Sequence, residues 1–187
     1  LNFLTKCASE YRNNIRTNII AITGSCGKTT LKELLGNSMK KITQTSFSPK
    51  SYNNKFGVPL SLFNLKQNAK FGIFEVGMDK KGEIDFLSKI LKPNLGVITN
   101  IGHAHAKNFR NINEIAKAKS EIIDNIKPGG SIVLNQDDKF YKFLETKAFK
   151  RNLKVFSFSI RNKKSYSKLI KIIKIKNKFK IYFKIGS

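Results

Sequence analysis

The feature that most constrains the fold is an apolar segment that runs directly into a glycine-containing loop and a helical pattern. Residues 18–23 (NIIAIT) form a largely apolar run, as in a strand buried within a parallel sheet. The loop Gly24 to Gly27 follows, and apolar residues then recur at helical spacing over 29–41, at Leu31, Leu34, Leu35 and Met39. A strand, a tight loop and a helix in this order predict the first unit of an α/β fold.

The same alternation continues along the chain. We expect further strands at 42–45, 71–76, 95–99 and 131–134, and further helices at 1–11, 58–65, 83–91 and 113–126. Strands that alternate with helices predict an α/β fold with a mostly parallel, doubly wound sheet of the phosphate-loop type, flanked by helices.

The last part of the chain has a different period. Leu169 to Ile185 (LIKIIKIKNKFKIYFKI) alternates apolar and basic residues around a turn at Lys176 to Lys178. Period two predicts a C-terminal antiparallel hairpin with one solvated face. An amphipathic helix on a membrane surface is the competing interpretation, although this period would scatter its lysines around a helix.

Length, charge and cysteine usage narrow the class of protein. The 187 residues suffice for one main domain, and no run of 18 apolar residues or signal-peptide core occurs, so we expect neither membrane insertion nor export. Cys7 and Cys26 form no disulfide or metal-ligand framework, which favours the cytoplasm. The net charge of +24 would attract nucleic acid, but the lysines are spread along the chain, so we expect solvated faces and no specific nucleic-acid partner.

The loop after the first strand has the residues of a phosphate-binding site: Gly24, Ser25, Cys26, Gly27, Lys28, Thr29 and Thr30. Glycines let backbone amides close around phosphate oxygens, and the following helix directs its positive end at the anion. Lys28 can reach the terminal phosphates and the Thr29 hydroxyl can bind Mg²⁺. Ile22 stands where the longer phosphate-loop pattern has its first glycine, and a plain structural turn is the alternative.

The stretch 22–30 (ITGSCGKTT) resembles the shortened phosphate loop of the Mur ligase family. Five further segments fit that family in the same order: 53–60 (NNKFGVPL), 74–78 (FEVGM), 99–105 (TNIGHAH), 116–119 (AKAK) and 133–138 (VLNQDD). The resemblance implies a middle ATP-binding domain over 17–187, entered by a linker helix at 1–16. It also implies N- and C-terminal domains that this sequence lacks, and the missing initiating Met suggests a fragment, so we expect the isolated chain not to ligate.

Three further residues are candidates for binding metal ions. Glu75 ends the expected strand 71–76, at the carboxyl edge of the sheet where ligands bind in open α/β folds, and its hard oxygens suit Mg²⁺. A carboxylate that pairs or caps at the strand end is the alternative. The resemblance implies that His105 helps to hold a second metal ion as part of the catalytic centre, whereas His103 has no such role.

Lys119 lies on the apolar stripe of a helix. Ile112, Ile115, Ile122 and Ile126 recur with it at spacings of three and four, so a lysine is predicted on the buried face. A buried ammonium must pair, snorkel or lose its proton. The resemblance implies a carbamylated lysine here, which is an anionic oxygen ligand for metal; a snorkelling lysine is the alternative.

Two pairs of polar residues complete the candidate site. Asn53 and Asn54 precede a turn, and the resemblance implies that this segment faces the substrate, although plain turn formation would also explain them. Asn135 and Asp138 follow a strand end, where they could contact ATP or cap a helix.

Within the family, the segments are most similar to members that add D-alanyl-D-alanine to UDP-N-acetylmuramoyl-tripeptide during peptidoglycan synthesis. This implies ATP and Mg²⁺ as cofactors and an acyl phosphate intermediate. Ala106 and Lys107 depart from the pattern of those members. The alternatives are a ligase of the folylpolyglutamate or cyanophycin synthetase kind, a phosphate-loop NTPase stimulated by nucleic acid, and a catalytically silent nucleotide-binding module.

Overall fold

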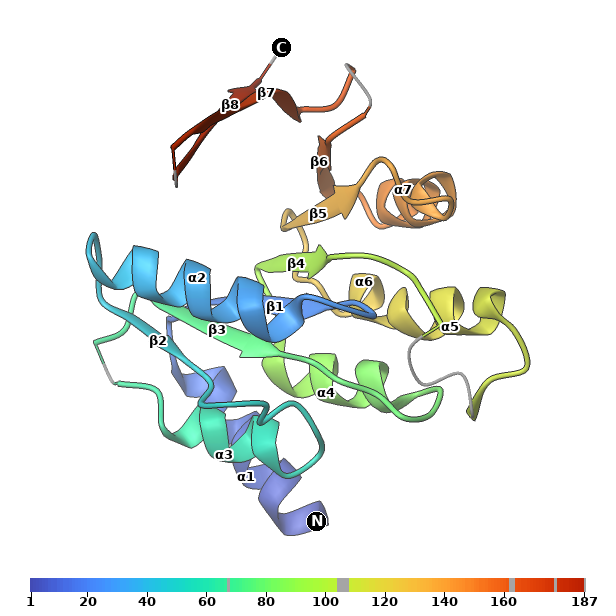
Figure 1. Cartoon of the computed structure of the whole chain (residues 1–187). Helices are drawn as coiled ribbons and strands as arrows, with labels where there is room; N and C mark the ends of the chain where they lie inside the picture. Colours follow the sequence, from blue (N-terminus) through green and yellow to red (C-terminus); the bar gives the residue numbers. More distant parts are fainter. Residues whose placement is uncertain (67, 104–107, 162–163, 177, 187) are drawn as a thin grey trace.

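A single eight-stranded sheet organises the chain in the computed structural model (Figure 1), which describes residues 1–66, 68–103, 108–161, 164–176 and 178–186. The strand order is β2-β3-β1-β4-β5-β6-β7-β8. All neighbours pair in parallel except β7 and β8. The strands are β1 (Asn18–Thr23), β2 (Thr45–Phe47), β3 (Phe71–Glu75), β4 (Leu95–Ile98), β5 (Ser131–Asn135), β6 (Lys154–Ser159), β7 (Ser167–Ile175) and β8 (Lys178–Ile185).

Helices cover both faces of the sheet. The helix α2 (Lys28–Lys40) packs on one face against Ile20, Ile22, Ile73 and Val97. The opposite face is covered in Figure 1 by α1 (Asn2–Asn14), α3 (Gly57–Phe63), α4 (Glu83–Leu91), α5 (Ile112–Lys119) and α6 (Glu121–Asp124), which build the larger apolar core. The helix α7 (Tyr141–Lys150) packs beside β5 and β6. The predicted doubly wound α/β fold is therefore confirmed.

Several local predictions differ from the structure. Ile42 continues the turn after α2 and is 86% exposed, so β2 begins only at Thr45. The predicted helix 113–126 breaks at Ser120, whose carbonyl accepts a hydrogen bond from Lys147. The helix α7 and the strand β6 are present in the structure but were not predicted from the sequence pattern. Leu34, expected on the buried stripe of α2, is 63% exposed, whereas Lys32 is fully buried.

The antiparallel hairpin is present, but it has no sheltered face. Every described residue of β8 is exposed, and Ile172 and Ile181 are more than half exposed although they face each other across the hairpin. A register irregularity between Leu169 and Lys171 keeps the pairs Leu169–Phe183 and Ile172–Ile181 on one face of the hairpin, while Lys168 and Lys184 pair on the other. None of the helices in the described ranges combines the length and hydrophobicity needed to span a membrane.

The topology gathers the candidate residues at one edge. Because β1, β3, β4 and β5 run in parallel, the loops that follow them emerge together at the carboxyl edge of the sheet. Ile22, near the end of β1, pairs with Glu75 in β3. The phosphate loop and Glu75 are thus neighbours because of strand register alone.

The helix α1 is tied to the domain by a buried arginine. Arg12 is 2% exposed, and its Nε donates to the carbonyl of Leu91 at 2.6 Å. Its Nη2 donates to the carbonyl of Lys92 at 3.2 Å and its Nη1 to that of Ile15 at 3.1 Å. One guanidinium thus binds carbonyls at the C-terminal ends of both α4 and α1. The helix dipoles favour a cation at such ends, which adds to the hydrogen bonds of Arg12.

We expect Arg12→Met to lower the free energy of unfolding by about 3 kcal/mol, because three carbonyls would lose a charged donor in a buried setting. Urea denaturation measures this difference. Arg16→Met is the matched control, since Arg16 is exposed, and it should change stability by less than about 0.5 kcal/mol. Equal effects of the two substitutions would contradict the anchoring role of Arg12.

Candidate functional site

The phosphate loop is pressed against the end of β4. Gly24 has φ +144°, and a Cβ built on it would lie 1.9 Å from the Thr99 hydroxyl oxygen, so only glycine fits there. The Ser25 amide donates to the carbonyl of Asn100 at 3.0 Å. The Ser25 hydroxyl also bridges the carbonyl of Gly102 at 3.0 Å and its amide at 2.8 Å. The loop is therefore shaped by the segment that follows β4.

Cys26 takes part in this clamp through its backbone. Its amide donates to Oδ1 of Asn100 at 3.0 Å, and its carbonyl accepts from the Thr99 hydroxyl at 2.6 Å and from Nδ2 of Asn100 at 3.1 Å. Gly27 then takes the left-handed conformation, with φ 81°, and caps α2. The first helical residue is Lys28, so the positive end of α2 opens at the loop.

Two lysines converge on one carbonyl in the loop. Nζ of Lys28 donates to the carbonyl of Gly24 at 3.0 Å, and Nζ of Lys119 donates to the same oxygen at 3.1 Å. Lys119 is 1% exposed, as the stripe on α5 predicted. Burial, and then the charge of Lys28, lower the pKa of Lys119 to about 8 from its ordinary value of 10.5.

Glu75 lies beside the first turn of α2. Its carboxylate is 1% exposed and accepts the Thr29 hydroxyl on Oε2 at 2.7 Å and Nδ2 of Asn53 on Oε1 at 2.7 Å. Three segments far apart in sequence, α2, β3 and the loop before α3, thus meet at one carboxylate. Within the described residues, no three His, Cys, Asp or Glu side chains cluster closely enough to hold a metal ion by themselves.

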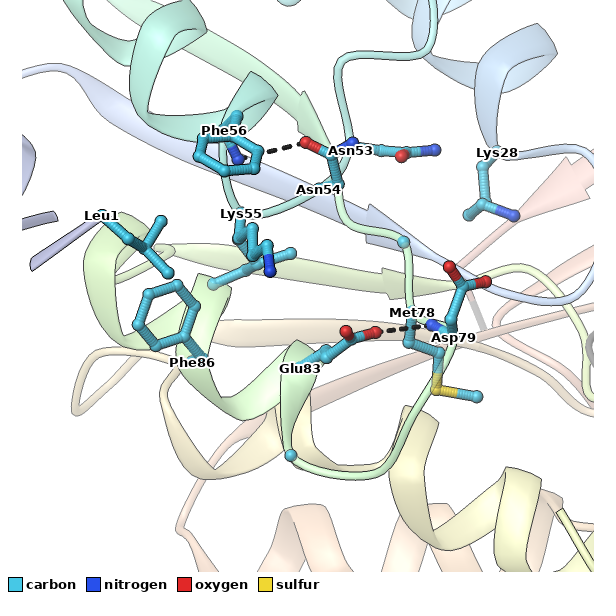
Figure 2. A pocket seen from close by; sticks show the side chains of 13 residues that line it. Leu1, Lys28, Asn53, Asn54, Lys55, Phe56, Met78, Asp79, Glu83 and Phe86 are labelled. Atoms are coloured by element: carbon cyan, nitrogen blue, oxygen red, sulfur yellow. Dashed lines mark hydrogen bonds between the residues drawn. The ribbon is translucent and has the colours of Figure 1, made fainter. Parts of the chain in front are cut away.

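A cavity of about 490 Å³ opens next to these residues (Figure 2). In Figure 2, Lys28 and Asp79 lie at one end, Leu1 and Phe86 at the other, and Lys55 between them. The complete lining is Leu1, Lys28, Asn53, Asn54, Lys55, Phe56, Gly77, Met78, Asp79, Gly82, Glu83, Phe86 and Leu87. A charged end beside the phosphate loop and an apolar far end fit an elongated, amphipathic ligand.

The remaining candidates have different surroundings. Asn54 accepts the amides of Phe56 and Gly57 on its Oδ1, so its side chain supports the turn into α3 while it lines the cavity. Asp138 accepts the amide of Ile101 at 2.7 Å. Nδ2 of Asn135 reaches the carbonyl of Thr99 only at 3.5 Å.

Asp138 and Asn135 thus contact the segment that clamps the phosphate loop, and α7 begins without a side-chain cap. Thr30, the last residue proposed for ATP binding, is exposed on α2. His105 lies outside the described residues, as do Ala106 and Lys107, and His103 is exposed.

Sequence reasoning missed two contributors to this arrangement. Thr99 and Asn100 clamp the phosphate loop, and their position directly after an apolar strand could have indicated it. Lys32 is fully buried behind the loop, but it reads as an ordinary charged residue of a surface helix. Glu121, on the next helix α6, accepts the amides of Gly82 and Asp85 and so holds the start of α4.

The family follows from comparison with known proteins. The family model for the Mur ligase middle domain matches residues 22–186. The chain belongs to the Mur ligase family. The resemblance inferred from the phosphate loop and the five later segments is therefore confirmed.

Relatives and solved structures agree with this membership. The chain is 38% identical to a UDP-N-acetylmuramoyl-tripeptide--D-alanyl-D-alanine ligase of Buchnera aphidicola over 86% of its own length and 35% of the relative's. It is 40% identical to the ligase of that name from Borreliella burgdorferi, over 76% of the chain and 31% of the relative. The chain therefore spans about a third of the length of these relatives.

Two crystal structures show the same architecture. MurF from Acinetobacter baumannii is 31% identical, with a TM-score of 0.89 over 97% of this chain and 39% of that protein. MurF from Thermotoga maritima, solved in complex with ADP, is 27% identical, with a TM-score of 0.87 over 98% of this chain and 42% of that protein. The fold of this Mur ligase middle domain is thus that of the MurF ligases.

The lowered pKa of Lys119 makes stability depend on pH. Between pH 8 and 10.5 the unfolded chain holds a proton on Lys119 that the folded protein has lost, so folding becomes more favourable as pH rises through this window. Relative to Lys119→Met, we expect the wild type to gain up to about 3 kcal/mol across it. Urea denaturation at several pH values, in buffers freed of CO₂, measures the gain.

The matched control is Lys117→Met, because Lys117 is an exposed lysine on the same helix. Its stability should run parallel to that of the wild type through the same pH range. A constant difference between Lys119→Met and the wild type would show that burial does not shift the pKa of Lys119.

Proposed function

We propose that this domain binds ATP for a ligase that adds D-alanyl-D-alanine to UDP-N-acetylmuramoyl-tripeptide in peptidoglycan synthesis. The observation that carries the proposal is a contact at the positive end of α2. There Thr29, which directly follows Lys28, donates a hydrogen bond to the buried carboxylate of Glu75. Two relatives that bear this ligase name are 38% and 40% identical to the chain. The substrates are those of a cytoplasmic reaction, because ATP and nucleotide precursors are found there.

ATP would bind with its phosphates in the loop from Gly24 to Thr30. Backbone amides of Ser25, Cys26 and Gly27 lie near the positive end of α2, where they could bind phosphate oxygens. Lys28 would exchange its hydrogen bond to the Gly24 carbonyl for one to a phosphate oxygen. Asn135 and Asp138 would contribute through the Thr99–Ile101 segment that they contact. The ADP bound to the Thermotoga maritima MurF supports a nucleotide in this fold.

Mg²⁺ fits the pair formed by Thr29 and Glu75. A hydroxyl and a carboxylate are hard oxygen ligands, and the buried carboxylate has only neutral hydrogen-bond donors in Thr29 and Asn53, so a cation would compensate its charge. When bound, Mg²⁺ would neutralise the charge that develops during phosphoryl transfer. His105 would help to hold a second ion.

Lys119 would be carbamylated. Its pKa of about 8 leaves a fraction of neutral amine near neutral pH, and that amine can attack CO₂ with formation of an N–C bond and release of one proton. The product is an anion, which relieves the repulsion between two ammonium groups at the Gly24 carbonyl. It would also supply an oxygen ligand for the second metal ion.

The peptide substrate would occupy the cavity lined by Asn53 and Asn54. Its carboxylate attacks the γ-phosphate of ATP, so a C–O–P linkage forms and ADP leaves. The amine of D-alanyl-D-alanine then displaces phosphate to give the amide. Lys28 would stabilise the transferring phosphoryl group, and positioning would supply most of the rate. Domains before and after 17–187 would complete the substrate sites, with α1 as the entering helix.

We expect Glu75→Gln in the full-length enzyme to lower kcat for ligation at least about 100-fold, because the amide keeps the shape but loses the charge that a cation needs. Release of phosphate with UDP-N-acetylmuramoyl-tripeptide, D-alanyl-D-alanine and ATP measures the rate. Glu10→Gln, at an exposed carboxylate of α1, should leave kcat unchanged.

The same assay decides against the alternatives. A wild-type enzyme that hydrolyses ATP only when nucleic acid is added, and never with muramyl peptides, would replace the proposal with a nucleic-acid-dependent NTPase. An enzyme that binds ATP but turns over neither substrate would be a silent nucleotide-binding module.

Lys119→Ala should lower kcat about 100-fold or more, and short carboxylic acids should restore part of the activity by standing in for the carbamate. Carbon-13 NMR with labelled bicarbonate should detect one carbamate in the wild type and none in Lys119→Ala. Lys117→Ala is the matched control and should retain both the signal and the rate. A wild type without a carbamate signal would leave Lys119 as a plain buried lysine.

A further inference from the structure

Lys32 is a buried charge that the proposed chemistry does not use. It lies on α2 one turn after Lys28, and its side chain is 0% exposed. The ammonium donates to the carbonyl of Ser48 at 2.7 Å and to that of Lys50, and it lies 3.1 Å from Oε1 of Glu33. Two carbonyls thus accept hydrogen bonds from the ammonium and a carboxylate lies within ion-pair distance, which compensates the cost of burying the charge.

The apolar packing of α2 does not need this lysine. Leu31, Leu35 and Met39 already pack against the sheet, and a Cβ on Gly36 would lie 2.3 Å from the Phe47 ring, so the helix is held close to β2 elsewhere. The contacts of Lys32 instead go to backbone carbonyls at the start of the loop between β2 and α3. Its role must therefore be sought in that loop.

The loop from residue 48 to 56 carries one wall of the cavity. Asn53, Lys55 and Phe56 line it, and Asn53 also donates to Glu75 at 2.7 Å. The loop is fixed to β3, where the Ser48 amide donates to the carbonyl of Ile73, and to the segment just after β3, where the Gly77 amide donates to the carbonyl of Asn53.

Between these fixed points the backbone is strained. Lys50 has φ 45°, a left-handed conformation that non-glycine residues adopt at a cost. The carbonyl of this strained residue is one of the acceptors of Lys32. A charged hydrogen bond to a strained peptide is a direct means of holding it in that conformation.

We propose that Lys32 is a positioning residue that holds the 48–56 loop so that Asn53 and the cavity wall are in place for the peptide substrate. It does so from the same helix whose first turn holds the phosphate loop, so one rigid element sets both halves of the site. This inference rests on the proposed ligase function. The inference concerns binding of the peptide substrate and not of the nucleotide, because the 48–56 loop lines the cavity proposed for the peptide.

The test compares Lys32→Met with the wild type in the full-length ligase. Methionine keeps an unbranched side chain, one atom shorter than that of lysine, but removes all three donors. We expect KM for UDP-N-acetylmuramoyl-tripeptide to rise about tenfold, while KM for ATP stays within about twofold. A purely structural role would instead lower the active fraction, and hence the apparent kcat, and leave both KM values alone.

Lys41→Met is the matched control, because Lys41 is an exposed lysine just beyond the end of α2, and both of its KM values should equal those of the wild type. Equal KM values for the peptide in Lys32→Met and the wild type would overturn the inference, as would an equal rise in KM for ATP. If Lys32→Met shows no cooperative thermal transition, Lys32→Gln, which keeps a neutral donor, is measured against the same criteria. Absence of ligation by the wild type would count against the proposed function itself.

Discussion

A buried carboxylate at the end of β3 is the contact on which the rest of the site depends. Glu75 binds Thr29 through one oxygen and Asn53 through the other, so the first turn of α2 and the loop before α3 meet at a single residue. Burial raises the cost of leaving this charge without partners, and strand register supplies its position. The α/β topology thus brings the carboxylate to the phosphate loop, and hydrogen bonds to it arrange the surrounding loops.

The phosphate loop is held from the opposite side by β4. Thr99, Asn100 and Gly102 bind the backbone or hydroxyl of Ser25 and Cys26, while Asp138 binds the amide of Ile101. The contacts of Cys26 with Thr99 and Asn100 use its backbone amide and carbonyl, so their geometry tolerates a change of side chain at Cys26. The loop is therefore held by Glu75 and α2 on one side and by the segment after β4 on the other, so its backbone needs little rearrangement when an anion binds. Such preorganised donors stabilise developing charge efficiently.

The sequence predicted those parts of the fold and site that follow from local periodicity. The apolar run before Gly24 and the stripe through Ile115 and Lys119 are local patterns, and both occupy the predicted places. Lys32 could not be predicted, because its burial depends on a loop 16 residues later in the chain that folds back over α2. At Ser120, where the predicted helix breaks, the carbonyl accepts the ammonium of Lys147, a tertiary contact that helix periodicity does not predict.

The positions of a few charged groups at the site, and not the net positive charge of the chain, determine which ions it can bind. Lys28 and Lys119 both reach the Gly24 carbonyl beside the positive end of α2, whereas Glu75 places a buried carboxylate against Thr29 in the first turn of that helix. Such a cluster lowers the pKa of Lys119 and attracts a polyanion, while the charge of Glu75 is the one that the proposed first Mg²⁺ would compensate. A carbamate on Lys119 would reverse the charge of one lysine, and that single change would add the negative charge that the proposed second metal ion needs beside the phosphates.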